Sequence, residues 1–225
     1  MINRIVDDVA TALSDVADGA TVLIGGFGGA GSPTHLIDGL LAQGARDLTV
    51  VVNNAGNGET GLAALLKARR VKRILCSFPR SADSHVFDGL YRAGEIELEL
   101  VPQGNLAERL RAAGAGIGGF FTPTGFGTEL AKGKEVRRIN GRDHVFESPI
   151  HGDVALIQAR CADRWGNLTY SKTARNFNPV MATAAACTVA EVKQVVPLGE
   201  MDPEAIITPG VYVQRVVVTA PGETA

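Results

Sequence analysis

The strongest constraint on the fold of this chain is the stretch Thr21–Pro33, which reads TVLIGGFGGAGSP. A short apolar run leads directly into five glycines within seven positions, and an amphipathic segment follows from Pro33. This pattern predicts a buried strand, a tight loop and a helix. Because glycine allows close backbone approach and a helix N-terminus offers unpaired N–H groups, the loop is a candidate site for an anionic or phosphate-bearing ligand.

The first half of the chain repeats this strand–helix pattern four times. The expected strands cover residues 20–24, 47–52, 71–78 and 96–101, and the expected helices cover 33–43, 61–70, 81–94 and 105–116. Such alternation predicts an α/β fold with an open, mostly parallel sheet covered by helices. The helical spacing of Ile5, Val9, Leu13 and Val16 predicts one further helix over residues 3–17.

The second half is richer in β-structure, and we expect it to complete the same sheet system. The glycine- and threonine-rich residues 114–128 predict an extended loop, and Asn140-Gly141 predicts a hairpin. The alanine run 182–187 predicts a helix. The further strands that we expect here cover residues 153–159, 188–196 and 211–219.

Composition narrows the class of protein. The net charge of −2 over 225 residues gives no argument for nucleic acid, and no apolar run approaches the roughly 20 residues that span a bilayer. The cysteines, Cys76, Cys161 and Cys187, are scattered and odd in number, so they predict neither a disulfide framework nor a metal site. The N-terminus lacks the pattern of a signal peptide. We therefore expect a cytoplasmic protein without nucleic-acid or membrane partners, folded as a single domain over 1–225 with a loose tail over 218–225.

Uncharged amides stand where two of the expected strands end. Asn53 and Asn54 close the second strand, and Gln103 follows the fourth. Because ligands of parallel sheets bind beyond the carboxyl ends of the strands, we expect these amides to meet the glycine loop at one edge. Such side chains suit hydrogen bonding to a carbonyl, a carboxylate or a developing oxyanion.

The residues alone leave the function open. The segment 26–31 fits the dinucleotide pattern G-x-G-x-x-G, but Asn53-Asn54 replaces the acid that would hold a ribose, and the lysine of a P-loop is absent. Cys76 is interpreted as a core thiol. No metal-ligand spacing is present, and the carboxylates nearest glycine-rich segments lack an evident activating partner; these are Glu59, Glu108, Glu129 and Glu147. The chain is either a binding protein or an enzyme whose reactive group comes from elsewhere.

Several longer blocks resemble the alpha subunits of the two-component 3-oxoacid CoA-transferases. These blocks are VLIGGF (22–27), VNNAG (52–56), VPQGNLAERLRAAGAG (101–116), FFTPTGFGT (120–128), ADRWGNLTY (162–170) and ARNFNP (174–179). The resemblance covers about residues 2–218. The segments 53–66 and 76–99 look most similar to members that act on 3-oxoadipate.

This resemblance implies an activity that needs two chains. It implies a homologous beta subunit, an α2β2 or similar assembly, and ping-pong transfer of CoA from succinyl-CoA to a 3-oxoacid. The resemblance implies 3-oxoadipate as the 3-oxoacid, with acetoacetate as the alternative. It also implies that the CoA thioester is a substrate and that no cofactor stays bound. The family's nucleophilic glutamate lies in a Ser-Glu-Asn-Gly motif of the beta subunit, and Glu147 stands in a different context here. The chain alone is therefore expected to be inactive.

The resemblance also assigns site residues. It matches Asn53, Asn54 and Gln103 to the amides that line the acyl site. It matches the family's CoA-binding glycine loop to Gly25, Gly26, Phe27, Gly28, Gly29, Ala30 and Gly31. The loop either touches CoA or only shapes the acyl pocket. A non-catalytic CoA-binding module is the alternative of a different class.

Overall fold

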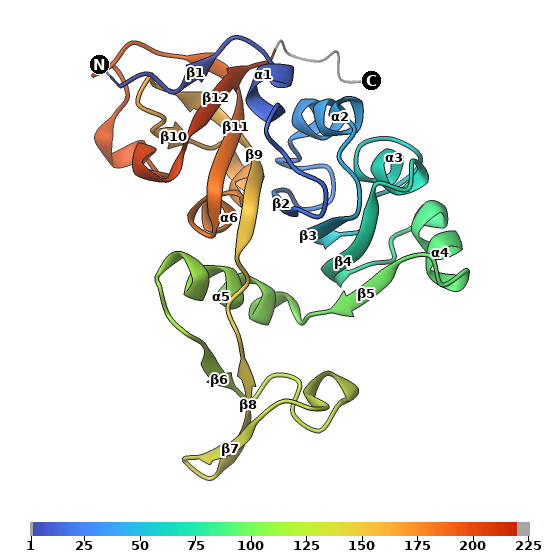
Figure 1. Ribbon diagram of the computed structural model, residues 1–225. Coiled ribbons are helices and arrows are strands. Elements are labelled where there is room, and N and C mark those ends of the chain that lie inside the picture. The colour runs from blue at the N-terminus through green and yellow to red at the C-terminus, as the bar shows by residue number, and fades with distance from the viewer. Residues whose placement is uncertain (1, 220–225) are drawn as a thin grey trace.

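The computed structural model describes residues 2–219 and is built on one large sheet (Figure 1). Its strands are β1 (Ile5–Val6), β2 (Thr21–Ile24), β3 (Leu48–Asn54), β4 (Val71–Phe78), β5 (Glu97–Leu100), β9 (Gly152–Ala162), β10 (Leu168–Thr169), β11 (Ala185–Val195) and β12 (Arg215–Val218). The order is β1-β12-β11-β9-β2-β3-β4-β5, with β10 attached to β9. Only β10 is antiparallel to its neighbour. The expected mostly parallel sheet, completed by the second half of the chain, is confirmed.

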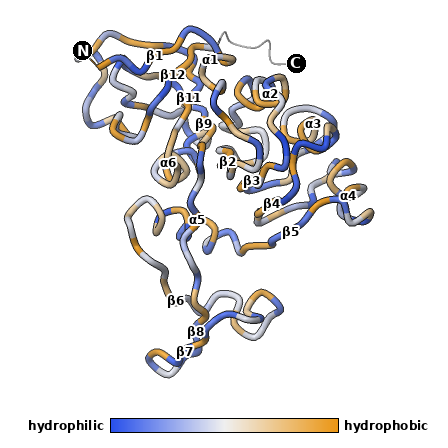
Figure 2. The backbone as a smooth tube through the Cα atoms, in the orientation of Figure 1, coloured by the Kyte–Doolittle hydropathy of each residue, from blue (hydrophilic) through white to orange (hydrophobic). Residues whose placement is uncertain are grey.

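Helices cover both faces of this sheet. One face carries α1 (Val9–Leu13), α2 (Thr34–Gln43), α3 (Leu62–Lys67) and α4 (His85–Arg92), and the other carries α5 (Gln103–Gly114) and α6 (Asn178–Thr183). Successive side chains of a strand point to opposite faces, so the core is divided into two hydrophobic clusters, one on each face of the sheet. Val22 and Val50 belong to the cluster under α1–α4, while Leu23 and Val51 belong to the cluster under α5 and α6. Strands buried on both faces explain why their sequences are continuously apolar, as the orange central segments of Figure 2 show.

A small antiparallel sheet, which we call the projecting sheet, stands away from the main body (Figure 1). It consists of β6 (Phe120–Thr122), β7 (Val136–Ile139) and β8 (Arg142–Glu147) in the order β6-β8-β7, with a 3₁₀ turn over Glu129–Ala131. The expected hairpin is confirmed, because Asn140 and Gly141 both have positive φ, as a type I′ turn requires. The expectation of a loop over 114–128 was incomplete, since it contains β6.

Glu147 ties the projecting sheet to α5. Its side chain is only 3% exposed and accepts hydrogen bonds from Lys134 Nζ at 2.8 Å and Asn105 Nδ2 at 3.1 Å. Arg109 Nε lies 3.7 Å from its second oxygen. Two cations and an amide therefore compensate the buried carboxylate, as such burial demands.

Two of the predicted helices were wrong in extent. Within 3–17 only Val9–Leu13 is helical, because Ile5 and Val6 pair with β12 and the Asp8 carboxylate accepts the Thr11 N–H at 2.7 Å, which starts the helix late. The alanine run 182–187 begins in α6 but enters β11 at Ala185, where it pairs with β9. Sheet pairing here outweighs the helix propensity of alanine.

The C-terminal boundaries also differ from those predicted. The expected strand 211–219 starts only at Arg215, since Gly210–Tyr212 forms a 3₁₀ turn. The predicted tail begins too early, because Val218 lies in β12 and Thr219 N donates to Val192 O at 3.0 Å. Residues 220–225 of that tail lie outside the described part of the chain. None of the helices within 2–219 has the length and apolar character needed to cross a membrane.

Candidate functional site

A chain of hydrogen-bonded amides lies at the carboxyl edge of the sheet. Gln103 Nε2 donates to Asn53 Oδ1 at 2.8 Å, and Asn53 Nδ2 donates to Asn54 Oδ1 at 2.6 Å. The same oxygen of Asn54 accepts the backbone N–H of Gly28 at 3.2 Å. The prediction that the two strand ends and the glycine loop meet at one edge is therefore confirmed.

The members of this chain differ in exposure. Asn53 is 1% exposed and acts as the buried link, whereas Gln103 is exposed at the first position of α5. A primary amide nitrogen carries two hydrogens, and Asn53 takes one of those on Gln103. The hydrogen bond to Asn53 therefore fixes the orientation of the Gln103 amide, and its second N–H can donate to a ligand carbonyl or carboxylate.

The glycine loop is a tight reversal with little freedom. Phe27 and Ala30 exchange both backbone hydrogen bonds, at 3.0 and 3.1 Å, around Gly28-Gly29. The φ values of Gly26, Gly28 and Gly31 are +113°, +57° and +67°, a region that residues with a Cβ rarely adopt. The loop can therefore present backbone groups close to a ligand.

Two asparagines that the sequence analysis missed hold the other side of this loop. Asn176 Oδ1 accepts the Gly26 N–H at 3.1 Å, and its Nδ2 donates to Ala30 O at 2.9 Å. Asn178 is fully buried, and its Nδ2 donates to Gly31 O at 3.0 Å. The block ARNFNP was the available signal, since Asn178 begins α6 and Asn176 lies two residues before it. The distance in sequence between this block and the loop hid the contact.

A cavity of about 270 Å³ opens between the loop, α2 and the segment after β3. Of the seven loop residues expected to bind CoA, four line it: Gly25, Gly26, Gly28 and Gly29. Asn54 and Asn57 contribute amides, and Asp38 is the one carboxylate among the lining residues. The walls combine glycine backbone and small polar groups with the apolar side chains of Ile24, Ile37, Val52 and Leu62, which suits a neutral portion of a ligand.

The nucleophile candidates of this chain are engaged elsewhere. Burial raises the pKa of Cys76 to about 12, so the thiol stays protonated at neutral pH in the core, as predicted. All four candidate carboxylates have cationic partners: Glu59 with Lys67, Glu108 with Arg111, Glu129 with Lys132 and Glu147 with Lys134. Within the described residues no cluster of histidine, cysteine and carboxylate side chains could hold a metal ion.

A buried carboxylate also fixes the start of α2, the helix that follows the loop. Glu191 on β11 is 2% exposed; its Oε2 accepts the Leu36 N–H at 3.0 Å, and His35 Nδ1 lies 3.5 Å from its Oε1. Desolvation raises the pKa of Glu191 above its ordinary value, despite these partners.

This burial predicts a pH-dependent effect of Glu191→Gln. A carboxyl whose pKa is raised on folding contributes stability that is complete below its unfolded-state pKa and is lost as pH rises through the folded-state pKa. Glutamine mimics the protonated form, so we expect the variant to melt higher than the wild type at pH 7.5, by about 2–4 °C for each kcal/mol relieved. The difference should shrink toward pH 4. Thermal unfolding of both proteins across this range checks it, with the exposed Glu200→Gln as control; a pH-independent difference would contradict the assignment.

The open parallel sheet with a glycine loop and an amide rim at its carboxyl edge defines a ligand-binding α/β protein, and its family follows from comparison. Residues 6–219 match the Coenzyme A transferase family, and the chain belongs to this family. It is 64% identical over 217 residues to the A subunit of 3-oxoadipate CoA-transferase from Pseudomonas putida, covering 96% of this chain and 94% of that one. It is 47% identical over 215 residues to the A subunit of succinyl-CoA:3-ketoacid coenzyme A transferase from Helicobacter pylori, covering 96% and 92%.

A solved structure shares the fold. An acyl-CoA transferase from E. coli O157:H7, in a thioester complex with CoA, superimposes with a TM-score of 0.83 at 22% identity. The match covers 99% of this chain but 48% of that one. This chain therefore spans about half the length of that transferase.

Proposed function

We propose that this chain is the alpha subunit of a heteromeric CoA-transferase that moves CoA from succinyl-CoA to 3-oxoadipate. The observation that carries the proposal is the hydrogen-bonded amide chain from Gln103 through Asn53 and Asn54 to Gly28. Relatives named as 3-oxoadipate CoA-transferase subunits support the substrate, and the word subunit in their names supports a partner. Residues 1–225 act as one domain of this enzyme, in the cytoplasm.

The chemistry follows from carboxylate exchange on a thioester. A glutamate carboxylate, contributed by the beta subunit, attacks the thioester carbonyl, CoA thiolate leaves, and a mixed anhydride forms. The thiolate then attacks the glutamyl carbonyl and releases succinate, which leaves a glutamyl-CoA thioester. The carboxylate of 3-oxoadipate repeats the sequence in reverse order and departs as the CoA thioester.

The role of this chain in these reaction steps is to stabilise the negative charge that forms on the substrate. Negative charge develops on the carbonyl oxygen in each addition, and the free N–H of Gln103 stabilises it. Asn53 and Asn54 hold Gln103 and Gly28 in fixed positions relative to each other through the hydrogen bonds described above. The glycine loop forms one wall of the thioester site, and no cofactor remains bound between turnovers.

Acetoacetate is the second candidate acceptor, because relatives named as succinyl-CoA:3-ketoacid transferase subunits reach 47% identity. 3-Oxoadipate carries a terminal carboxymethyl group, and with it a second carboxylate, that acetoacetate lacks. Parallel kinetics with both acceptors distinguish them: 3-oxoadipate should give the higher kcat/KM, and the opposite order would assign the chain to the ketone-body substrate.

The division of the site between two chains is tested by expressing this chain alone and together with the product of the neighbouring gene. The isolated chain should give no CoA exchange between succinyl-CoA and 3-oxoadipate, while the co-purified complex should turn over. Strong exchange by the isolated chain would refute the split site. A complex that binds CoA but exchanges nothing would favour the non-catalytic module.

A further inference from the structure

The amide rim, formed by Gln103, Asn53 and Asn54, meets an acceptor acid that is charged at both ends. 3-Oxoadipate has one carboxylate that accepts CoA and a second, remote carboxylate that takes no part in the transfer. The amides of the rim can hydrogen-bond the reacting end, but they carry no charge. A remote carboxylate that leaves water for the site is compensated best by a cation close to the rim.

Arg80 is the one lysine or arginine in the segments that lead from β2, β3, β4 and β5 to the helices after them. These segments are residues 25–33, 55–61, 79–84 and 101–102. Ligands of parallel sheets bind beyond the carboxyl ends of the strands, which is where these segments lie. This part of the edge therefore offers a single permanent positive charge to an acidic ligand.

The backbone of Arg80 is close to the amide rim. Asn54 Nδ2 donates to Phe78 O at 3.4 Å, and Arg80 follows Phe78 by two residues. Two residues of extended chain span at most ~7 Å. Phe78 is itself 57% exposed, so it offers an apolar surface to the methylene groups that separate the two carboxylates of the acid.

The loop that carries Arg80 is fixed against a loop that lines the candidate cavity. Asp83 O accepts the Gly58 N–H at 2.8 Å, and the Ser81 hydroxyl donates to Asn57 Oδ1. Asn57 is one of the residues that line the cavity of about 270 Å³ beside the glycine loop. Arg80 is therefore held in a defined position relative to both the cavity and the rim.

One neighbouring carboxylate orients Arg80 and leaves most of its donors available. Arg80 Nε donates to Asp88 Oδ1 on α4 at 3.0 Å, and the arginine side chain is 58% exposed. A guanidinium has five N–H donors, and those on its two terminal nitrogens form a planar fork. Such a fork binds a carboxylate through two parallel hydrogen bonds.

Other cations close to the rim are engaged by carboxylates of this chain. Their pairs are Lys134 with Glu147, Arg109 with Glu99, and His85 with Asp83. Glu147 is buried, so withdrawing Lys134 from it to bind a ligand would leave a charge uncompensated.

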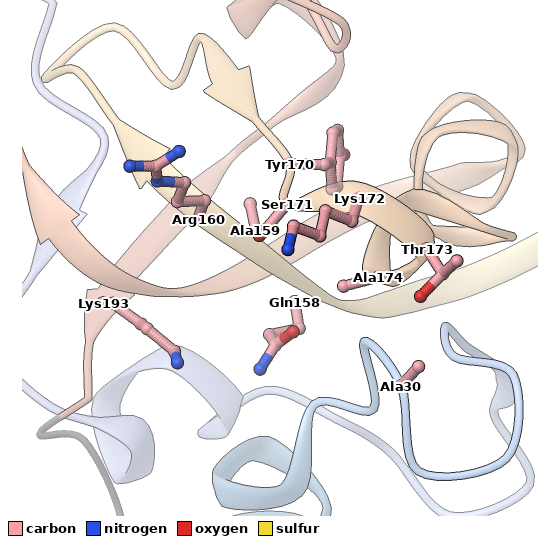
Figure 3. Close-up of a pocket in the computed structure, with 10 residues that line it drawn as sticks. All are labelled: Ala30, Gln158, Ala159, Arg160, Tyr170, Ser171, Lys172, Thr173, Ala174 and Lys193. Carbon is pink, nitrogen blue, oxygen red and sulfur yellow. The ribbon is translucent and has the colours of Figure 1, made fainter.

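Further cations lie on the other side of the glycine loop. Lys172 and Lys193 line a separate cavity of about 560 Å³ beside Ala30 (Figure 3). Ala30 O is held by Asn176, whereas the Gly28 N–H on the side of the rim is held by Asn54. The loop thus separates these lysines from the rim, and Arg80 is the cation placed to serve it.

We propose that Arg80 binds the remote carboxylate of 3-oxoadipate and sets the preference for this acid over acids that lack that group. The inference rests on the proposed function for the reaction and its acceptor. The reacting carboxylate lies at Gln103, the methylene groups pass Phe78, and the remote carboxylate meets the terminal fork of Arg80. Succinate has a shorter carbon chain between its carboxylates, so the free carboxylate of succinyl-CoA stops short of Arg80.

The test compares 3-oxoadipate with 3-oxohexanoate, which has a methyl group in place of the remote carboxylate. CoA exchange from succinyl-CoA is measured on the purified complex of both subunits. We expect Arg80→Ala to lower kcat/KM for 3-oxoadipate roughly 10-fold to 100-fold, the usual effect of losing hydrogen bonds between charged groups, mainly through KM. The kcat/KM for 3-oxohexanoate and the KM for succinyl-CoA should equal those of the wild type. Arg80→Lys, which keeps the charge without the fork, should recover part of the loss.

Arg92→Ala is the matched control, since it removes another exposed arginine from the last turn of α4. It should leave the ratio of the two kcat/KM values as it is in the wild type. An active complex in which Arg80→Ala does not change this ratio, or lowers both values equally, would overturn the inference and leave the proposed function standing. A wild type that uses both acids equally well would do the same. A wild-type complex that exchanges CoA with neither acid would overturn the proposed function and the inference together.

Discussion

Gln103→Ala is expected to lower the turnover of the two-subunit complex roughly 10²-fold, the usual effect of removing one oxyanion donor. The side chain is exposed at the first position of α5, and its amide is oriented by Asn53 rather than packed in the core. Alanine is also well tolerated in a helix. The loss should therefore appear in kcat, measured by CoA exchange from succinyl-CoA, with an unchanged melting temperature.

The control for this prediction lies on the same helix. Glu108→Ala removes an exposed side chain whose partner is Arg111, a surface pair of small energetic value, and should leave turnover as it is. A Gln103→Ala complex that assembles, melts normally and turns over at the wild-type rate would remove Gln103 from the site.

Gly25→Ala is expected to destabilise the protein by roughly 3 kcal/mol or more, which corresponds to a fall in Tm of about 6–12 °C. A Cβ at this position would overlap Oδ1 of the fully buried Asn178. That oxygen accepts the Gln158 N–H at 3.0 Å, and the same side chain donates to Gly31 and Ala174. Displacing Asn178 would leave several buried polar groups without partners. Thermal or denaturant unfolding measures the loss.

Gly29→Ala separates this steric effect from a general intolerance of the loop to side chains. Neither Gly25 nor Gly29 has positive φ, and a Cβ at Gly29 would meet nothing within 4 Å. We expect Gly29→Ala to change Tm by no more than a degree or two. Equal destabilisation by both substitutions would show that the contact with Asn178 is not the cause.

Much of the fold could be predicted because the first half of the chain is locally consistent. The apolar runs at Val22–Ile24 and Val50–Val52 are short and continuous, which is typical of strands buried on both faces, and each precedes a helical period. The errors lie where a distant partner decides. Ile5 is drawn out of a helix by β12, and Ala185 is drawn into a strand by β9.

The residues of the candidate site likewise fall into those that local sequence patterns could place and those that depend on a distant partner. Asn53, Asn54 and Gln103 could be placed together because topology alone brings the carboxyl ends of parallel strands to one edge. Asn176 and Asn178 could not, because the order of the sheet jumps from β2 to β9, and no local pattern indicates that neighbourhood. The burial of Glu147 could not be predicted either, because its partners Asn105 and Lys134 are brought to it only by the packing of the projecting sheet against α5.

The two ends of the large sheet bear on how copies and partners of this chain can associate. An exposed, regular edge strand invites another chain to continue the hydrogen-bond ladder, which leads to aggregation. Here one end is the two-residue β1, and the other is the four-residue β5, in which Glu97 and Glu99 alternate with leucines. The shortness of β1 and the two glutamates of β5 resist such strand addition. Orderly assembly with a second subunit is thereby directed toward side-chain surfaces, where shape and charge can select the correct partner.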